Sequence, residues 1–221
     1  MGTRAGVGYS ENPDSDVAGA EAARAALERA GVTRCDLVLL FAAAKHDAAR
    51  ILRSVRAIVG PEATIIGGGA VGAITNDRLG YEGCQVGIAV IASDSMAART
   101  FLQPGLASTS ELEVGRALGA QIRAAGVERE APMLLMYESV KRSTPEGPML
   151  NMGAPLLEGM QEVLGTWPPV VGLGMHGDLR WRPGLQYFGD RLESQSALAV
   201  TFSGNVKMSP VVINNLRPMS T

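Results

Sequence analysis

The sequence carries the pattern Gly-x-Gly-x-x-Gly twice, and each copy directly follows a short apolar run. The first copy spans residues 67–72 after Ile65 and Ile66, and the second spans residues 172–177 after Val170 and Val171. A buried strand that leads into a glycine-rich turn is a distinctive local design, so two copies in one chain indicate two related halves. This feature predicts an internally duplicated unit.

Two further matches occur in the same order along the chain. They are AGVTR at 30–34 with AGVER at 125–129, and GIAV at 87–90 with ALAV at 197–200. We interpret residues 1–221 as a single domain with pseudo-repeat halves of about 1–105 and 106–221. The register slips at residues 143–149 and 180–190, which we interpret as loop insertions.

Apolar periodicity predicts an α/β chain of mixed α+β type. Helical spacing, with polar starts and glycine stops, predicts helices over residues 16–30, 46–59, 110–125 and 150–164. Apolar runs predict strands over residues 5–10, 36–41, 64–66, 85–93, 96–102, 133–137, 170–171, 186–189, 197–202 and 206–213. Only Asp94 and Ser95 separate two of these strands, which predicts a hairpin.

Two arrangements would satisfy both halves. Two mixed β-sheets could pack face to face with helices outside, as an αββα sandwich, or all strands could form one continuous sheet.

Charge and hydropathy exclude several classes of partner. The formal net charge is −2 and no run of Lys or Arg exceeds a pair, which argues against nucleic acid and anionic membrane surfaces as partners. No stretch approaches the length of a membrane span, and the N-terminus lacks the apolar region of a secretory signal. We therefore expect a cytoplasmic protein with no membrane insertion.

The glycine pattern resembles a dinucleotide-binding fingerprint, but its context argues against that function. Pyrophosphate binding needs the glycines to open a helix, whose N–H groups hold the phosphates. The first copy is followed by a short polar segment ending at Gly80, and the second by a segment containing Pro183. We expect instead that the glycines let the backbone pass close to a neighbouring strand or adopt positive φ.

Polar side chains beside these glycines are the candidates for a ligand site, because loops at the carboxyl ends of strands commonly bind ligands in α/β sheets. The candidate ligand-binding residues are Tyr9, Ser10, Asn12, Gly68, Gly69, Gly72, Thr75, Asn76, Gly174, His176, Gly177 and Asp178. The alternative for Asn12, Thr75, Asn76 and Asp77 is that they satisfy hydrogen bonds within their own turns.

Metal and catalytic motifs are sparse. No second His or Cys lies at metal-ligand spacing from His176, so we expect no metal and no cofactor. His46 is expected to be a solvated residue at a helix start. Cys35 and Cys84 are expected to be small buried or half-buried side chains.

By its motifs the chain resembles the FIST N-terminal domain family. The motifs are AGVGYS with the following Asn12-Pro13-Asp14 turn, the run 36–41, the segment 66–74, Tyr81-Glu82-Gly83, His176-Gly177-Asp178 and Phe188-Gly189. The resemblance implies a sensory module of intracellular signal transduction that binds small ligands, with amino acids proposed. In that family the module occurs with kinase, cyclase or chemoreceptor output domains.

The sequence departs from the family pattern in its first glycine turn. Gly68, Gly69 and Ala73 stand where the family often has Cys, Ser or Thr, and Glu. Recognition would then shift to backbone N–H groups, Thr75 and Asn76. A second FIST domain usually follows the first, and here the sequence ends about where that C-type domain would begin.

We therefore predict a sensory domain, not an enzyme, that binds a small molecule among the turns after residues 10, 72 and 177. Its expected partners are a small-molecule ligand, and a C-terminal FIST-type domain or signalling output partner. One alternative is an enzyme that uses His176 and Asp178 as an acid–base pair. The other is a purely structural half of a larger two-domain protein.

Overall fold

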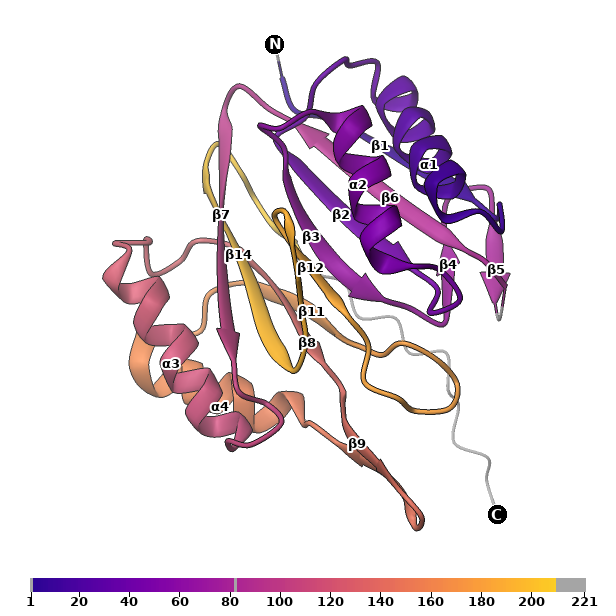
Figure 1. The fold of residues 1–221 in the computed structure, drawn as a ribbon. Coiled ribbons are helices and arrows are strands. Elements are labelled where there is room, and N and C mark those ends of the chain that lie inside the picture. Colours follow the sequence, from indigo (N-terminus) through magenta and orange to yellow (C-terminus); the bar gives the residue numbers. More distant parts are fainter. Residues whose placement is uncertain (1, 82, 210–221) are drawn as a thin grey trace, which may run out of the picture.

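Two mixed β-sheets lie face to face, and a pair of helices covers the outer face of each (Figure 1). The structure is a computed structural model that describes residues 2–81 and 83–209. The arrangement confirms the α/β class and selects the αββα sandwich over one continuous sheet.

The first sheet has the strand order β1-β6-β2-β3-β12-β13. These strands are β1 (Arg4–Ser10), β6 (Val86–Ala92), β2 (Leu37–Ala42), β3 (Thr64–Gly69), β12 (Gln186–Phe188) and β13 (Arg191–Glu193). Helices α1 (Ser15–Ala30) and α2 (Ala48–Val59) pack on its outer face. The inner side of α1 is almost all alanine, which brings the helix axis close to β1, where a Cβ on Gly8 would overlap the backbone of Ala22.

The second sheet has the strand order β11-β8-β14-β7. Its strands are β11 (Val170–Met175), β8 (Met133–Glu138), β14 (Ser196–Gly204) and β7 (Met96–Pro104). Helices α3 (Glu111–Ala124) and α4 (Gly153–Leu164) cover its outer face through Leu118 and Leu156, which are fully buried.

The second sheet repeats the topology of the first four strands of the first sheet. The order β1-β6-β2-β3 corresponds to β7-β14-β8-β11, and each pair has the same parallel or antiparallel sense. The chain passes from one sheet to the other between β6 and β7, at Asp94 and Ser95. The internal duplication stays a prediction, and this correspondence would place its boundary there rather than at residue 105.

The hairpin predicted for residues 85–93 and 96–102 is wrong. β6 pairs with β1 and β2, whereas β7 pairs with β14 in the other sheet. A two-residue connection between apolar runs favours a hairpin locally, but here the strands that pair with β6 and with β7 lie elsewhere in the chain. The connection therefore crosses the sandwich.

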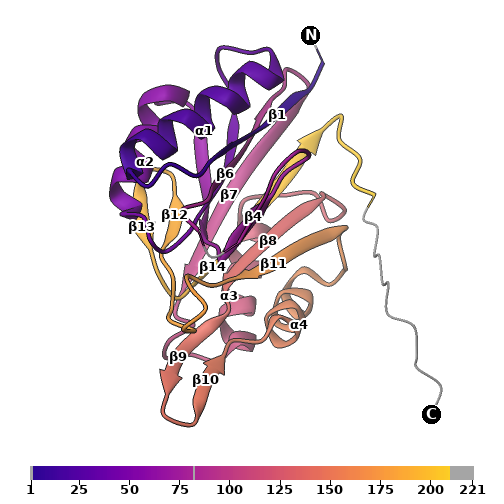
Figure 2. The same cartoon turned by 90° about the vertical axis from the view of Figure 1, so that its right-hand side faces the viewer.

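An apolar layer fills the space between the sheets. Its buried members are Leu37, Ile66, Met136, Met175, Leu198, Val200 and Phe202. The flexible methionine side chains suit the uneven gap between two twisted surfaces. In both views the two sheets lie between α1 and α2 on one side and α3 and α4 on the other (Figure 2).

Most glycines of the two strings lie in strands rather than in the turns that the sequence predicted, and Gly177 alone among them lies in a loop. Gly67–Gly69 end β3, and Gly172 and Gly174 lie within β11. A Cβ on Gly67, whose φ is +145°, would overlap the carbonyl oxygen of Leu40 in the adjacent strand. A Cβ on Gly172 would overlap the corresponding oxygen of Leu135. The expected close approach to a neighbouring strand is thus confirmed at equivalent positions of both sheets.

Three other segments differ from expectation. The predicted loop 143–149 is part of a ribbon of β9 (Val140–Thr144) and β10 (Gly147–Leu150), so the helix predicted from residue 150 begins at Gly153. A second ribbon, β4 (Gly72–Ile74) with β5 (Leu79–Tyr81), follows β3. Of the strand predicted over 206–213, residues 206–209 belong to no helix or strand, and residues 210–213 lie outside the described residues.

Both cysteines are free thiols, with Cys35 buried and Cys84 half-buried. None of the helices in the described part of the chain is long and apolar enough to cross a membrane.

Candidate functional site

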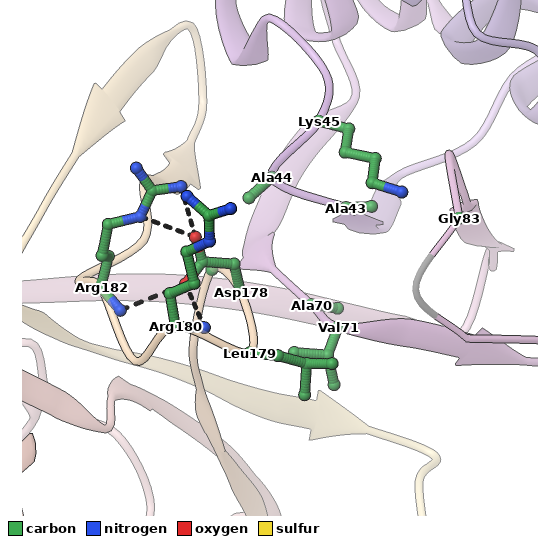
Figure 3. Close-up of a pocket in the computed structure, with 11 residues that line it drawn as sticks. Ala43, Ala44, Lys45, Ala70, Val71, Gly83, Asp178, Leu179, Arg180 and Arg182 are labelled. Atoms are coloured by element: carbon green, nitrogen blue, oxygen red, sulfur yellow. Dashed lines mark hydrogen bonds and ion pairs between the residues drawn. The ribbon is translucent and has the colours of Figure 1, made fainter.

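A cleft of about 560 Å³ lies where the carboxyl ends of β2, β3 and β11 meet. Its walls are the loop after β2, including Ala43, Ala44 and Lys45, the residues Ala70 and Val71 after β3, and the loop 176–185 after β11 (Figure 3). The volume falls within the range of small-molecule sites. Because β3 belongs to the first sheet and β11 to the second, the cleft is built from both units.

A smaller hollow of about 250 Å³ shares five residues with this cleft and extends it toward α2. His46 and Tyr187 lie at its far end, and both are buried. The two hollows together form one depression along the loop 176–185.

Small residues allow the walls to meet. The Gly69 N–H donates to the carbonyl oxygen of Leu185 at 3.0 Å, which ties β3 to the loop after β11. A Cβ on Gly69 would lie 2.9 Å from the Cα of Gly177, and a Cβ on Gly177 would lie 3.1 Å from the Cα of Gly184. Glycine at 69 and 177 therefore sets the shape of the cleft by close backbone packing.

Asp178 organises the loop 176–185. Its carboxylate accepts hydrogen bonds from the N–H groups of Arg180 at 2.9 Å and Arg182 at 3.3 Å, and from Nε of Arg182 at 2.7 Å. Burial alone would raise the pKa of Asp178, but the bonds from Arg182 and the charge of that guanidinium lower it overall. Asp178 therefore stays ionised and holds the turn that presents both arginines.

Among the described residues that line the cleft, cationic side chains outnumber acidic ones. Lys45, Arg180 and Arg182 line it, and Asp178 is the one acidic side chain among its described lining residues. This local excess of positive side chains contrasts with the formal net charge of the whole chain, which is −2.

Glu138, at the end of β8, anchors the far end of the same loop. Its side chain is 1% exposed, and its carboxylate accepts hydrogen bonds from the N–H groups of Val140 at 3.0 Å and Gly184 at 2.9 Å. Burial raises the pKa of Glu138 to about 7, although the two backbone hydrogen bonds oppose that shift. The loop is thus fixed at one end by a carboxyl group that titrates near neutral pH.

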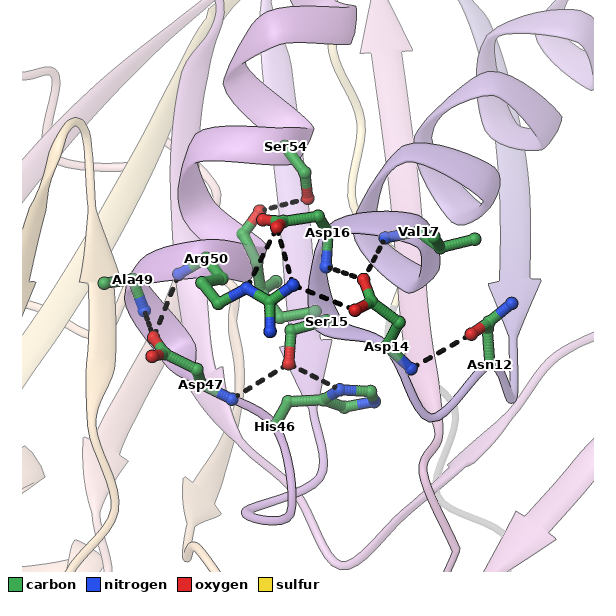
Figure 4. Close-up of polar contacts among 11 residues, drawn as sticks. Asn12, Asp14, Ser15, Asp16, Val17, His46, Asp47, Ala49, Arg50 and Ser54 are labelled. Carbon is green, nitrogen blue, oxygen red and sulfur yellow. Dashed lines mark hydrogen bonds and ion pairs between the residues drawn. The ribbon is translucent and has the colours of Figure 1, made fainter.

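His46 is buried, so the expectation of a solvated side chain is wrong. Its Nδ1 lies 3.2 Å from Oγ of Ser15, and its Nε2 lies 2.9 Å from the carbonyl oxygen of Cys84 (Figure 4). Because a carbonyl oxygen only accepts, Nε2 carries the proton. Nearby, the Arg50 guanidinium bridges Asp14 at 2.9 Å and Asp16 at 2.7 Å. These contacts fix the starts of α1 and α2 beside the hollow.

Three of the predicted ligand residues meet at this depression, namely Gly69, Gly177 and Asp178. Gly68 lies next to them in β3, where a Cβ would press against Sδ of Met175 at 2.7 Å. Gly174 lies in β11 beside Tyr137 and Ser139, outside the two hollows.

The polar residues at the end of β1 and just after it form hydrogen bonds with nearby residues rather than lining the cleft. Tyr9 donates to Glu11 at 2.5 Å, and Ser10 donates to Glu21 at 2.7 Å. The Asn12 side chain accepts from the N–H of Asp14 at 3.0 Å. They line neither hollow.

The residues after the first glycine string form the β4–β5 ribbon. Gly72 pairs with Tyr81, and Thr75 donates to Asp77 at 3.1 Å near the ribbon's tip. Asn76 is exposed beside it. These residues also line neither hollow, so their predicted role in binding has no geometric support.

His176 stacks on Trp181, with ring centroids 5.1 Å apart and ring planes 10° from parallel. In the described part of the chain no hydrogen bond joins His176 to Asp178, whose oxygens instead face Arg180 and Arg182. The acid–base pair of the enzyme alternative therefore stays a prediction.

Lys45, Arg180 and Arg182 line the cleft but were not among the site residues predicted from the sequence. Lys45 could have been predicted from its position in the sequence. It follows the carboxyl end of a predicted buried strand, as the predicted site residues do. Arg180 and Arg182 fell in a segment interpreted as an insertion. In residues 2–81 and 83–209 no group of three or more His, Cys, Asp or Glu side chains could hold a metal ion.

Comparisons with known proteins give one family. The family model described as the FIST N domain matches residues 36–221. No curated protein shows significant sequence similarity to the chain.

Two solved structures are similar at low identity. One is titled as a cyanuric acid hydrolase from A. caulinodans, with a TM-score of 0.43, 12% identity, and coverage of 93% of this chain and 72% of that chain. The other, titled as a cyanuric acid hydrolase arising by structural concatenation, has a TM-score of 0.41, 9% identity, and coverage of 91% and 69%.

Proposed function

The chain belongs to the FIST N domain family, and on that premise we propose that it is a sensory domain that binds a small ligand in the cleft between residues 43–45 and 177–182. The observation that carries the proposal is the cleft itself, because loops of two structural units meet there around a ligand-sized space. Amino acids and related metabolites are the first candidates for the ligand.

Ligand binding could be coupled to signalling because the cleft is formed by loops from both structural units. Lys45 stands on a loop of the first sheet's unit, and Arg180 stands on the loop after β11 of the second. A ligand that contacts both loops stabilises one relative arrangement of the two, and so shifts the population of conformations. A signalling output partner or a C-terminal FIST-type domain would then read the arrangement of these loops.

Trp181 provides a direct reporter of binding, because it lies on the loop 176–185 and stacks on His176. The chain has two tryptophans, so Trp167→Phe leaves Trp181 as the single fluorophore. A screen of amino acids and related metabolites by thermal shift and calorimetry should yield a binder that also changes the Trp181 emission. Both signals saturate at the same ligand concentration if the binder occupies the cleft.

A blocking variant tests the location. Ala44 is an exposed residue of the cleft wall, and Ala44→Phe fills the space without disturbing the core. Ala120→Phe places the same side chain on an exposed position of α3 as the matched control. We expect Ala44→Phe to abolish binding and Ala120→Phe to retain it. Equal binding by both variants, or no binder for the wild-type protein in the screen, contradicts the proposal.

A further inference from the structure

The outer edge of β11 differs from the corresponding edge of the first sheet. There, β3 pairs on its outer side with the antiparallel strand β12, whereas no strand of the described residues pairs with the outer side of β11. Figure 2 shows β11 at the margin of its sheet, beside α4. The edge of β11 therefore has room for one more antiparallel strand.

The backbone groups that this edge offers can be assigned residue by residue. The N–H of Met133 in β8 donates to the carbonyl oxygen of Pro169 at 2.8 Å, so the odd-numbered residues of this segment direct their backbone groups toward β8. The direction alternates along a strand, so Val170, Gly172 and Gly174 direct their N–H and C=O groups outward. These three residues present a regular ladder of donors and acceptors to an incoming strand.

The side chains along the edge are apolar and exposed. Val171 is 36% exposed, Leu173 is 40% exposed and Trp167, just before the strand, is 47% exposed. Residues 165–175 include no charged side chain, and both prolines of that segment precede β11. Natural proteins usually protect an edge strand with charges, proline or a bulge, so an unprotected apolar edge favours pairing with another strand.

The strand is complementary to a second copy of itself. In an antiparallel pair with its two-fold axis at Gly172, the outward backbone groups of the two Gly172 residues meet. Val170 of each copy then lies opposite Gly174 of the other, where its side chain meets no side chain. Val171 lies opposite Leu173, so the exposed apolar side chains of the two copies contact each other across the axis. No like charges meet within the paired segment.

A groove of about 230 Å³ lies between β11 and α4 along this edge. Its lining includes Gly172 and Gly174 of β11, Tyr137 of β8, and Leu157 of α4. Opposite residues of an antiparallel pair face the same side of the sheet, so Val170 of the second copy lies on the side of the groove. The glycines thus leave space for an apolar side chain that self-pairing supplies.

We propose that the outer edge of β11 is a dimerisation surface, on which β11 of a second copy pairs antiparallel about a two-fold axis at Gly172. The second sheets of the two copies then join into one continuous sheet. Residues 170–174 do not line the cleft, so the inference is independent of the proposed ligand site. The paired segment is short, so we expect a weak, reversible dimer with a dissociation constant of about 1–100 μM.

Sedimentation velocity on the full chain, at about 1 to 300 μM, brackets that range. The mean mass should rise from monomer toward dimer with concentration. Leu173→Lys places a charge in the middle of the apolar contact and should raise the dissociation constant at least ten-fold. Leu79→Lys introduces the same charge at a leucine of β5 that is 75% exposed, and as the matched control it should dimerise like the wild-type protein.

Cysteine cross-linking tests the register. Val171→Cys and Leu173→Cys are made separately, each with Cys84→Ser to remove the half-buried native thiol. Opposite residues have Cβ atoms about 4.5–5.5 Å apart, whereas identical residues in this pairing lie on a longer diagonal. A mixture of the two variants should therefore form disulfide-linked dimers faster than either variant alone.

Several results would overturn the inference. They are a wild-type chain that stays monomeric over the whole range, a dimer that Leu173→Lys leaves intact, and cross-linking at equal rates in the mixture and in the single variants. A variant that ends at Ser209 examines another occupant, namely residues 210–221 of the same chain. Dimerisation of that variant alone would show that this segment competes for the edge, and the wild-type dimer would then be wrong.

Discussion

At the scale of single residues, Glu138 places a buried carboxyl group beside the loop that forms one wall of the cleft. It receives two backbone N–H groups, and no cation faces it in the described residues. Elements packed around it contribute amide groups, namely Asn151, whose Nδ2 donates to the Glu138 carbonyl oxygen at 2.8 Å, and the loop at Gly184. The energy of the charged carboxylate is therefore raised by burial without compensation from a salt bridge.

This environment predicts an unusual dependence of stability on pH. The folded-state pKa of Glu138 is about 7, above the ordinary value of 4.5, so the folded state binds the proton more tightly than the unfolded chain. The stabilising contribution is present below about pH 4.5 and is lost as pH rises toward 7. Over that window Glu138 should lower the free energy of unfolding by about 2 to 3 kcal/mol.

Urea denaturation at several pH values, with Glu138→Gln as the reference, checks this prediction. The glutamine variant cannot ionise, so the difference in unfolding free energy between the two proteins should change by that amount between pH 5 and 8. Parallel pH profiles for the two proteins would show that the buried carboxyl titrates normally.

At the scale of elements, β12 connects the cleft to the rest of the first sheet. It follows the loop 176–185 directly and pairs with β3 through Tyr187 opposite Gly67. Tyr187 is 2% exposed and belongs to the core beneath α1 and α2. In the second sheet no strand pairs with the outer edge of β11 within the described residues. The contact between β12 and β3 is thus one anchor of this cleft wall, beside the hydrogen bond from Gly184 to Glu138.

Truncating this anchor should affect both stability and binding. We expect Tyr187→Ala to lower the free energy of unfolding by about 3 to 5 kcal/mol, as for other buried aromatic side chains. Ligand affinity should fall as well, because the loop loses its fixed end. Leu185→Ala, which shortens a side chain that is 46% exposed, is the matched control and should stay within about 0.5 kcal/mol of wild type. A small loss for Tyr187→Ala, measured by thermal and urea unfolding, would contradict this role for β12.

Elements governed by local chemistry were predictable from the sequence. Asp14 caps α1 by accepting from the N–H groups of Asp16 and Val17, and Gly31 ends the helix with φ of +64°, as the polar start and glycine stop indicated. The two missed ribbons and the wrong hairpin depended instead on pairing between distant segments, which local propensity does not encode.

At the scale of the whole molecule, the sequence indicated two similar units, and the structure has two sheets of matching strand order. The candidate site was predicted only in part, because the glycines were interpreted as turns that carry polar residues. Most of them are strand residues that bring backbones together. Thr75 and Asn76 therefore lie on the β4–β5 ribbon outside the cleft, which is lined instead by residues such as Lys45 and Arg180. That exchange could not be derived from spacing, since it depends on how the two sheets meet.

Amide chemical-shift mapping by NMR would locate the ligand site on the protein residue by residue. The full ¹⁵N-labelled chain would be titrated with the tightest binder found in the screen. We expect the largest shifts in residues 43–46, 69–71 and 177–184, which lie at the cleft and its extension. Shifts concentrated at residues 9–12 and 75–76, with the cleft residues unchanged, would contradict it.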